Sequence, residues 1–389
     1  MLSRLVLSKN NLFFAFLIFG YLFGVIFYDF IEFSYVDELM ALFLVVFAGM
    51  IVIERKNWKE LKSIGILTGI LSFYLIYSFI IKSNTPGAII MDFLTQIKPF
   101  LGFYCTLLIA PRLTIPQKRF LSILCIIIAG GLLILGFIDT NFLFFGHQSR
   151  YATAIVVTFF LLCYCSTNSW SDIMILLLIL TIGLISTRSK FYGFWAIAIF
   201  LMIYVKVGGE IHFNIKTASL FIGLLFIAVW LARDKIILYY VDGMMNSREM
   251  WSRPAMMLTS IQILYDYFPF GSGLASFGTF ASAEYYSPTY AVYGLDHLWG
   301  LSKEMPTFIC DAFYPELAQF GVVGVILYFT FWGTILRKSA KELLPEIQLF
   351  VLLIFLFFLS FFLFLFIIPT CNIRTKAARA ATVAANAMI

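Results

Sequence analysis

Two cations, Arg188 and Lys190, lie in the turn STRSK at residues 186–190, between two apolar segments that each look long enough to cross a membrane. Cytoplasmic loops of membrane proteins are rich in Lys and Arg, and loops on the outer side are poor in them. The charge pattern of the whole chain places this turn on the outer side, where a cationic cluster is not expected. The two cations therefore suggest an anionic ligand at the outer membrane face, and a lipid-linked phosphate is the first candidate.

Three arginines could extend this anion site. Arginine suits a diphosphate because its planar guanidinium binds two phosphate oxygens together and stays protonated. Arg248 is the first candidate for stabilising a departing diphosphate, and Arg253 and Arg150 are further candidates. Each of them could instead be an ordinary boundary cation that reaches the interface or pairs with an acid such as Glu249.

Lys98 is a separate case because it lies beside Pro99 inside an apolar segment, FLTQIKPFLGF. An ionisable group within a span normally faces a cavity or a partner rather than lipid. The expected topology places Lys98 in the outer half of the membrane, where it could reach the same diphosphate. Pairing with a neighbouring carboxylate is the alternative.

The general base is less constrained by the sequence. Asp311 could orient or deprotonate an attacking hydroxyl, and it could equally be the N-cap of the helix that follows it. His297 in the long hydrophilic stretch could serve instead, and His147 lies in another external turn. The histidines are far apart, and no acidic pair with ligand spacing accompanies them. We therefore predict neither a metal site nor a cofactor, and a divalent ion bound through the diphosphate stays open.

The composition excludes an ordinary soluble domain. The chain is 62% hydrophobic and 12% charged, with a mean hydropathy of +0.95, whereas a soluble domain carries about twice this charged fraction. Apolar segments near the ~20 residues needed to span recur without the alternation of barrel strands, so helices are expected to make the crossings. The net charge of +6 is modest, so nucleic acid is not an expected partner. The six cysteines form no CxxC pair, which favours small buried side chains over a disulfide or metal framework.

The predicted fold class is an all-α polytopic membrane protein, a single helical membrane domain over residues 1–389 with about 11–12 transmembrane helices. The basic N-terminus is interpreted as part of a retained first helix, and the bias of Lys and Arg toward alternate turns places it in the cytoplasm. Under this count the basic tail after Thr370 falls on the outer side, where basic residues are not expected. Either the count is wrong by one helix, or the C-terminus is truncated or altered. The predicted spans are 12–28, 39–54, 64–81, 93–110, 120–137, 151–166, 171–186, 191–206, 217–232, 312–336 and 345–369.

The segment 233–309 is the long hydrophilic stretch of the chain, and the topology makes it one large external loop between late spans. A helix is expected from about Pro254, with Met257 and Ile261 on one apolar face, before the glycine-rich turn FPFGSGLASFG. Aromatic side chains such as Trp251 and Tyr286 could stack on sugar rings of a glycan or acceptor, although resting at the membrane interface is the commoner use. Function is expected to lie in this segment.

Four motifs, STRSKFYGFW, SREMWSRPAMM, FPFGSGLASFG and CDAFYPELAQFGVVG, occur in this order around the large loop. Together they resemble the membrane family of O-antigen polymerases and O-antigen ligases, over most of the chain from about residue 140 onward. The resemblance implies a metal-independent glycosyltransferase of the GT-C type at the periplasmic face of the bacterial inner membrane. Its donor would be an undecaprenyl-diphosphate-linked glycan, without a nucleotide sugar.

The resemblance also implies roles for single residues. Lys190 matches the family's basic residue after the span, and Arg248 matches the arginine before the loop tryptophan, here Trp251, so both are implied diphosphate ligands. Ligases of the family carry a His-Asn pair at the start of the late helix, where this chain has Cys310 and Asp311. This departure favours the polymerase branch and leaves the general base undecided.

Three functions stay open on the sequence. A polymerase would pass the glycan to another lipid-linked repeat unit, with a chain-length regulator protein as a further partner. A ligase would pass it to lipid A-core. A non-enzymatic transporter of lipid-linked glycan is the alternative from another class, and would be expected to show internal repeats and polar residues in several spans.

Overall fold

The computed structural model describes residues 2–28, 36–56, 62–167, 169–208, 215–246, 250–311 and 315–342, and these residues are helices and connecting turns without a strand. Each predicted span before residue 345 coincides with a long helix, whereas the span predicted at 345–369 lies outside the described residues. The prediction of helices in these segments is confirmed. The long helices are α1 (Leu2–Tyr21), α2 (Val36–Arg55), α3 (Lys62–Ile81), α4 (Pro86–Ile109), α5 (Ile115–Ile138), α6 (Gln148–Cys165), α7 (Trp170–Ile182), α8 (Ser189–Gly208), α9 (Ile215–Ile236) and α13 (Pro315–Glu342).

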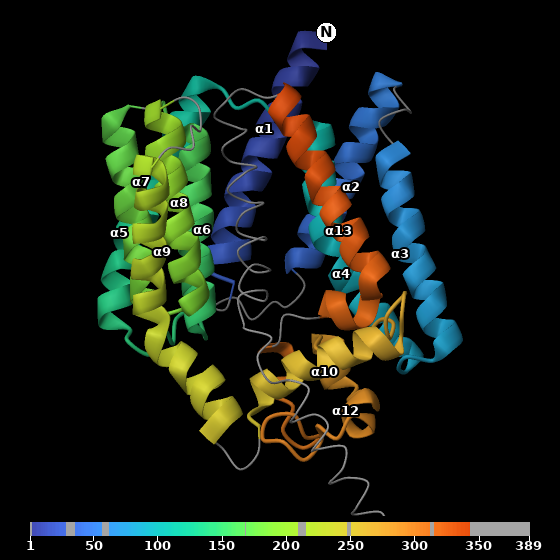
Figure 1. The fold of residues 1–389 in the computed structure, drawn as a ribbon. Helices are drawn as coiled ribbons and strands as arrows, with labels where there is room; N and C mark the ends of the chain where they lie inside the picture. Colours follow the sequence, from blue (N-terminus) through green and yellow to red (C-terminus); the bar gives the residue numbers. More distant parts are fainter. Residues whose placement is uncertain are drawn as a thin grey trace, which may run out of the picture.

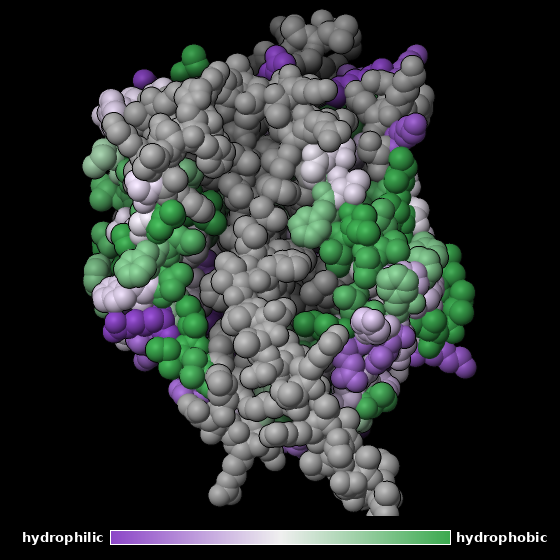
Figure 2. All heavy atoms as spheres, in the orientation of Figure 1, coloured by the Kyte–Doolittle hydropathy of each residue, from purple (hydrophilic) through white to green (hydrophobic). Residues whose placement is uncertain are grey.

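Three helices of the described part are long and apolar enough to cross a membrane, at Lys9–Ile26, Ile115–Ile138 and Gln148–Cys165. On α5, apolar side chains such as Ile127 and Phe137 are exposed rather than buried. Figure 2 shows hydrophobic side chains over both flanks of the bundle. Such flanks are expected of a protein whose outer surface meets lipid. That the remaining long helices also cross the membrane stays a prediction.

The bundle consists of two groups of helices with α1 between them (Figure 1). Helices α5 to α9 form one group, in which α5 packs on α6 and α8 on α9. Helices α2, α3, α4 and α13 form the other, in which α2 packs on α4. Helix α10 (Ser252–Asp266) crosses one end of the bundle, and the N-terminus of α1 lies at the opposite end. The predicted external segment and the N-terminus therefore lie at opposite ends of the helices.

The loop predicted at 233–309 begins with residues 233–246, which are helical and continue α9 as a π-helix. Residues 250–311 form a folded unit, which we call the cap. Besides α10, it contains α11 (Phe280–Glu284), α12 (Thr289–Val292) and the 3-10 helix η5 (Ile309–Asp311). The cap has its own hydrophobic core, in which the side chains with no exposed surface are Met256, Ile263, Phe277, Tyr290, Leu301 and Ile309. A chain segment that is hydrophilic on average thus gains enough apolar burial to fix its conformation.

Two glycines join the cap to α13. Gly271 in the FPFGSGLASFG turn has φ +80°, and Gly321 within α13 has φ +60°. A Cβ atom on either glycine would lie 2.4 Å from the backbone N of the other, a distance that no side chain can occupy. The Ser272 N–H donates to the Ala318 carbonyl at 2.8 Å beside this contact. Backbone meets backbone here because both residues lack a side chain.

A buried carboxylate on α4 holds the same turn. Asp92 is 1% exposed, and its Oδ2 accepts hydrogen bonds from the Ala275 N–H at 2.7 Å and from Gln319 Nε2 at 3.0 Å. Gln319 in turn accepts from the Ser276 N–H at 2.9 Å. This buried hydrogen-bond network fixes the cap to α4 and α13 together.

Candidate functional site

Three cations from separate parts of the chain meet at the cap end of α6, α8 and α9. We define the cation cluster as Arg188, Lys235 and Arg253, together with His147. Burial, followed by the positive charges of Arg188 and Arg253, lowers the pKa of Lys235 below its usual 10.5. Two of the arginines predicted from the sequence are therefore close enough to repel the same ammonium group.

Local structure explains how each side chain reaches the cluster. Thr187 adopts a left-handed conformation with φ +50°, which ends the helical run of α7 and allows α8 to begin at Ser189. Arg188 lies in the connection between these helices, and Lys235 lies in the last turn of α9, which packs on α8. The Lys235 ammonium donates to the Thr187 carbonyl. The antiparallel packing of α8 and α9 thus places the two cations at the same end.

His147 connects the cluster to α6. It is the N-cap residue of this helix, and its Nδ1 accepts a hydrogen bond from the Ser149 N–H at 3.3 Å. The Arg188 Nη2 lies 3.0 Å from His147 Nδ1 and 2.6 Å from Nε2. His147 thus connects the Arg188 guanidinium with the start of α6.

The electrostatics of the cluster favour an anion. Arg188, Lys235 and Arg253 are each half-buried, so part of the water that normally screens like charges is excluded. Burial is the main cause of the lowered pKa of Lys235, and the positive charges of Arg188 and Arg253 add to it. An anion with more than one negative charge would relieve this repulsion, and a diphosphate has the required charge and several acceptor oxygens.

The other predicted diphosphate ligands lie around or away from the cluster. The backbone N–H of Arg150 donates to the His147 carbonyl at 3.0 Å, and its guanidinium lies 5.1 Å from the ring centroid of Tyr28. Lys190 is exposed in the first turn of α8. Lys98 forms an ion pair with Glu38 of α2, in the helix group across α1 from the cluster.

The structure does not describe the side chains of the two residues predicted to take part in catalysis. Arg248 lies outside the described residues. Asp311 ends η5, and its side chain lies outside what the structure describes. Neither can be placed relative to the cation cluster, so their roles stay predictions.

The aromatic and histidine predictions in the cap fall at three different places. Trp251 precedes α10, and its backbone N–H donates to the Gly243 carbonyl at 3.0 Å. Its ring covers this glycine, because a Cβ on Gly243 would lie 3.1 Å from Trp251 Cγ. This packing positions the start of α10 and with it Arg253. His297 is exposed on a turn of the cap. Tyr286 is half-buried, and its hydroxyl donates to the Leu301 carbonyl at 2.8 Å.

Sequence reasoning missed Lys235. A lysine in the last turn of a helix is common because it interacts favourably with the helix dipole, so this one looked ordinary. The available signal was its place at the outer end of a predicted span, the same positive-outside departure that singled out Arg188. In the described part of the chain, no three His, Cys, Asp or Glu side chains are grouped so that they could hold a metal ion.

Compared with protein-family models, with curated proteins and with solved structures, the chain matches none.

Proposed function

We propose that this chain is a multi-pass membrane glycosyltransferase that polymerises a surface polysaccharide. It would transfer an undecaprenyl-diphosphate-linked glycan to another lipid-linked repeat unit at the periplasmic face of the bacterial inner membrane. The observation that carries the proposal is the meeting of Arg188 and Arg253 with Lys235. The two arginines come from motifs far apart in the chain, and they converge at the end of the bundle opposite the N-terminus.

The cation cluster suits the departing group of this reaction. An acceptor sugar hydroxyl attacks the anomeric carbon of the donor, the bond from that carbon to the diphosphate oxygen breaks, and the diphosphate takes the electron pair. Cations already arranged around the diphosphate stabilise the negative charge that develops on it without further reorganisation. In this proposal Arg248 adds to the cluster, and Asp311 orients the attacking hydroxyl or accepts its proton.

The choice of polymerase over ligase rests on residues 310 and 311. The ligase His-Asn pair would stand where this chain has Cys310 and Asp311, and Cys310 is exposed at the surface of the cap. A thiol there cannot replace a histidine as a base near neutral pH, because its ordinary pKa is about 8.5. A chain-length regulator protein is the proposed partner.

The test is the surface-glycan ladder of the source bacterium with this gene deleted. The strain is complemented with wild type, Arg188→Ala, Arg253→Ala or Arg248→Ala at matched membrane levels. We expect deletion to leave a single repeat on lipid A-core and the variants to fail to restore the ladder. Arg233→Ala is the matched control, because Arg233 is an exposed cation at the same end of α9 that pairs with Asp234.

Other outcomes would replace the proposal. Bare core with long lipid-linked glycan accumulating would identify a ligase. Full-length glycan in cells that carry the cluster variants would remove the cation cluster from the mechanism, and accumulation of untranslocated repeat units would favour a transporter.

A further inference from the structure

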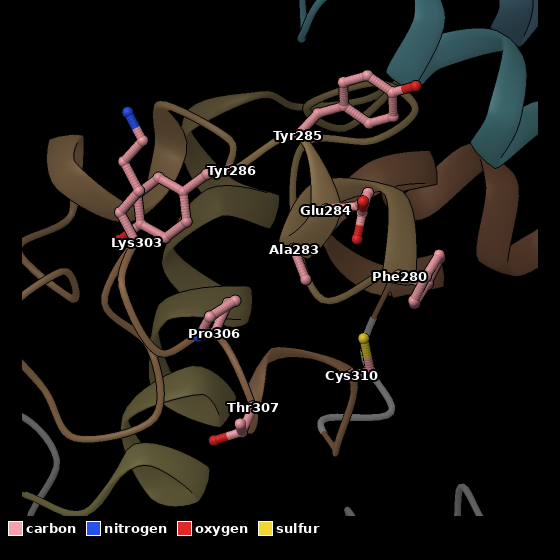
Figure 3. Close-up of a pocket in the computed structure, with 9 residues that line it drawn as sticks. All are labelled: Phe280, Ala283, Glu284, Tyr285, Tyr286, Lys303, Pro306, Thr307 and Cys310. Carbon is pink, nitrogen blue, oxygen red and sulfur yellow. The ribbon is translucent and has the colours of Figure 1, made fainter.

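A cavity of about 580 Å³ opens in the cap, separate from the residues of the cation cluster (Figure 3). Helix α11 and the turn that follows it form one wall, with Glu284, Tyr285 and Tyr286. The segment from Lys303 to Cys310 forms the other. This volume lies in the range of small-molecule sites in proteins, about 300–1,000 Å³.

The cavity combines exposed aromatic rings with a few polar groups. Phe280 and Tyr285 are 56% and 44% exposed, and Glu284, Lys303 and Thr307 supply a carboxylate, an ammonium and a hydroxyl. Aromatic rings accept the apolar face of a sugar ring, while charged and hydroxyl groups exchange hydrogen bonds with its hydroxyls. This pairing of surfaces is suited to a carbohydrate.

The aromatic wall is fixed before any ligand binds. The Tyr286 hydroxyl is held by the Leu301 carbonyl, and its ring lies 5.5 Å from that of the buried Tyr290. The Tyr290 hydroxyl in turn accepts from the Gly278 N–H at 2.8 Å and lies 2.8 Å from Ser282 Oγ. A preformed wall reduces the entropy lost on binding.

The charge around the cavity distinguishes it from the cation cluster. Burial, and then the negative charges of Asp296 and Glu304, raise the pKa of Tyr286. The lining itself holds one acid, Glu284, and one lysine, Lys303, so Asp296 and Glu304 beside Tyr286 make the surroundings of the cavity net negative. A phosphate or an acidic sugar would be repelled, whereas an uncharged sugar would not.

A chain of contacts connects the cavity with the start of α10. Ser252 Oγ donates to the Trp299 carbonyl, and the Trp299 ring lies 4.9 Å from that of Phe308, next to Thr307 in the cavity lining. Arg253 of the cation cluster follows Ser252 directly. The cavity and Arg253 therefore belong to the same folded unit, while the other members of the cation cluster lie outside it.

We propose that this cavity is a subsite for an uncharged oligosaccharide, which holds the glycan of a lipid-linked substrate while the cation cluster holds a diphosphate. The assignment rests on the proposed function. Tyr286 and Phe280 stack on sugar rings, and Glu284, Lys303 and Thr307 bond to their hydroxyls, whereas the Tyr285 ring points toward Gly87 of α4 (Figure 3). The site selects glycans by lack of charge.

Cys310 provides the test because it lines the cavity and is exposed, whereas Cys105, Cys125 and Cys165 are buried. In the full-length protein in detergent, with Cys163→Ser and Cys371→Ser, the rate of Cys310 alkylation by a maleimide is measured. The probes are the repeat-unit oligosaccharide released from its lipid and dephosphorylated, and inorganic pyrophosphate. We expect the oligosaccharide to slow alkylation saturably and pyrophosphate to leave it unchanged.

Phe280→Ala should weaken this protection by about tenfold, as expected for loss of an aromatic anchor. Tyr265→Ala is the matched control, since Tyr265 is 85% exposed on α10 and does not line the cavity. Calorimetric titration of the same oligosaccharide into wild type and Phe280→Ala measures binding independently of the thiol. Equal affinity of both for the oligosaccharide, or no binding to wild type, would overturn the assignment.

The outcome is separable from that of the proposed function. Farnesyl diphosphate, a short isoprenoid diphosphate without a glycan, probes the cation cluster by itself. If it binds in a way that depends on Lys235 while the oligosaccharide does not bind, the glycan subsite alone is wrong. If the oligosaccharide binds through Phe280 while cells with cluster variants make a normal ladder, the subsite stands and the catalytic proposal falls.

Discussion

Replacement of Lys235 by methionine is the sharpest test of the cation cluster. Methionine keeps most of the length and the apolar body of lysine and removes only the charge. Because Lys235 is half-buried and repelled by Arg188 and Arg253, its charge is costly to the free protein and useful only when an anion is bound. The substitution should therefore separate binding from stability.

The expected loss of binding follows from Coulomb's law. Two unit charges 4 Å apart interact by about 1 kcal/mol in water and about 4 kcal/mol at an effective dielectric of 20. Lys235 is half-buried and shares the anion with two other cations, so about 1–2 kcal/mol is expected. This corresponds to a loss of about 5- to 30-fold in affinity for a diphosphate.

The stability of the free protein should change little. Removing the ammonium group relieves repulsion from two cations and the cost of burying its charge, each on the order of 1 kcal/mol. It also removes the hydrogen bond to the Thr187 carbonyl, which at a charged donor is worth about 1.5–3 kcal/mol. These contributions nearly cancel, so we expect the melting temperature to move by only a few degrees.

The assay is titration of farnesyl diphosphate into the purified full-length protein at fixed ionic strength, with thermal unfolding of the same samples. Arg233→Met is the control, because Arg233 lies in the same helical turn, is exposed, and pairs with Asp234 at 3.2 Å. Equal affinity in wild type and Lys235→Met would refute the reasoning. An equal loss in Arg233→Met would show that only the general positive field of this end of α9 matters.

Three further predictions concern pH and the attachment of the cap. Because the pKa of Lys235 is lowered, this residue loses its proton at a lower pH than an ordinary lysine does. The affinity for farnesyl diphosphate should therefore fall as the pH rises toward 10.5. This fall should be smaller in Lys235→Met. In the free protein, the unfolded state holds this proton more tightly than the folded state, so the contribution of Lys235 to stability should rise with pH over the same window. Gly321→Ala places a Cβ 2.4 Å from the Gly271 backbone N at φ +60°, so it should lower the free energy of unfolding by about 3 kcal/mol or more, as measured by thermal unfolding. Gly333→Ala is the control, because a Cβ at Gly333 meets open space and should leave the stability unchanged. Asp92→Ala leaves the Ala275 N–H and Gln319 Nε2 without their acceptor and should lower the free energy of unfolding by about 2–4 kcal/mol. Asp92→Asn keeps an acceptor oxygen and should lower it less. Equal losses in the two variants would mean that these hydrogen bonds do not hold the turn.

The helices were predictable because length and apolar content are local properties of the chain. The segments 120–137 and 151–166, predicted as spans, lie within α5 and α6, and both helices can cross a membrane. Helix ends were predicted less well where they depend on single residues. Helix α4 begins at Pro86, well before the predicted 93, because the Thr85 side chain caps it and the cap turn packs on its first turns.

The interior of the cap was harder to predict from periodicity. Ile261 was expected on the apolar face of α10 with Met257, but it is 48% exposed, while Ile263 is fully buried. Helix α10 packs against α13 on one side and the rest of the cap on another, so its buried surface is not one stripe. The glycines of FPFGSGLASFG were expected to allow a turn, and Gly271 in addition allows contact with Gly321.

Composition and the length of the apolar segments determined by themselves that the chain is helical and contains helices able to cross a membrane. The positions of Lys and Arg further predicted that Arg188 and Lys190 are unusual for the side of the membrane on which they are expected, and Arg253 was a further candidate for the same site. Only the tertiary structure decided which cations meet, because proximity between residues far apart in the chain depends on how helices pack. The packing of α8 against α9 places Lys235 near Arg188 and Arg253. The packing of α2 on α4 places Lys98 beside Glu38, with which it forms an ion pair away from the cation cluster.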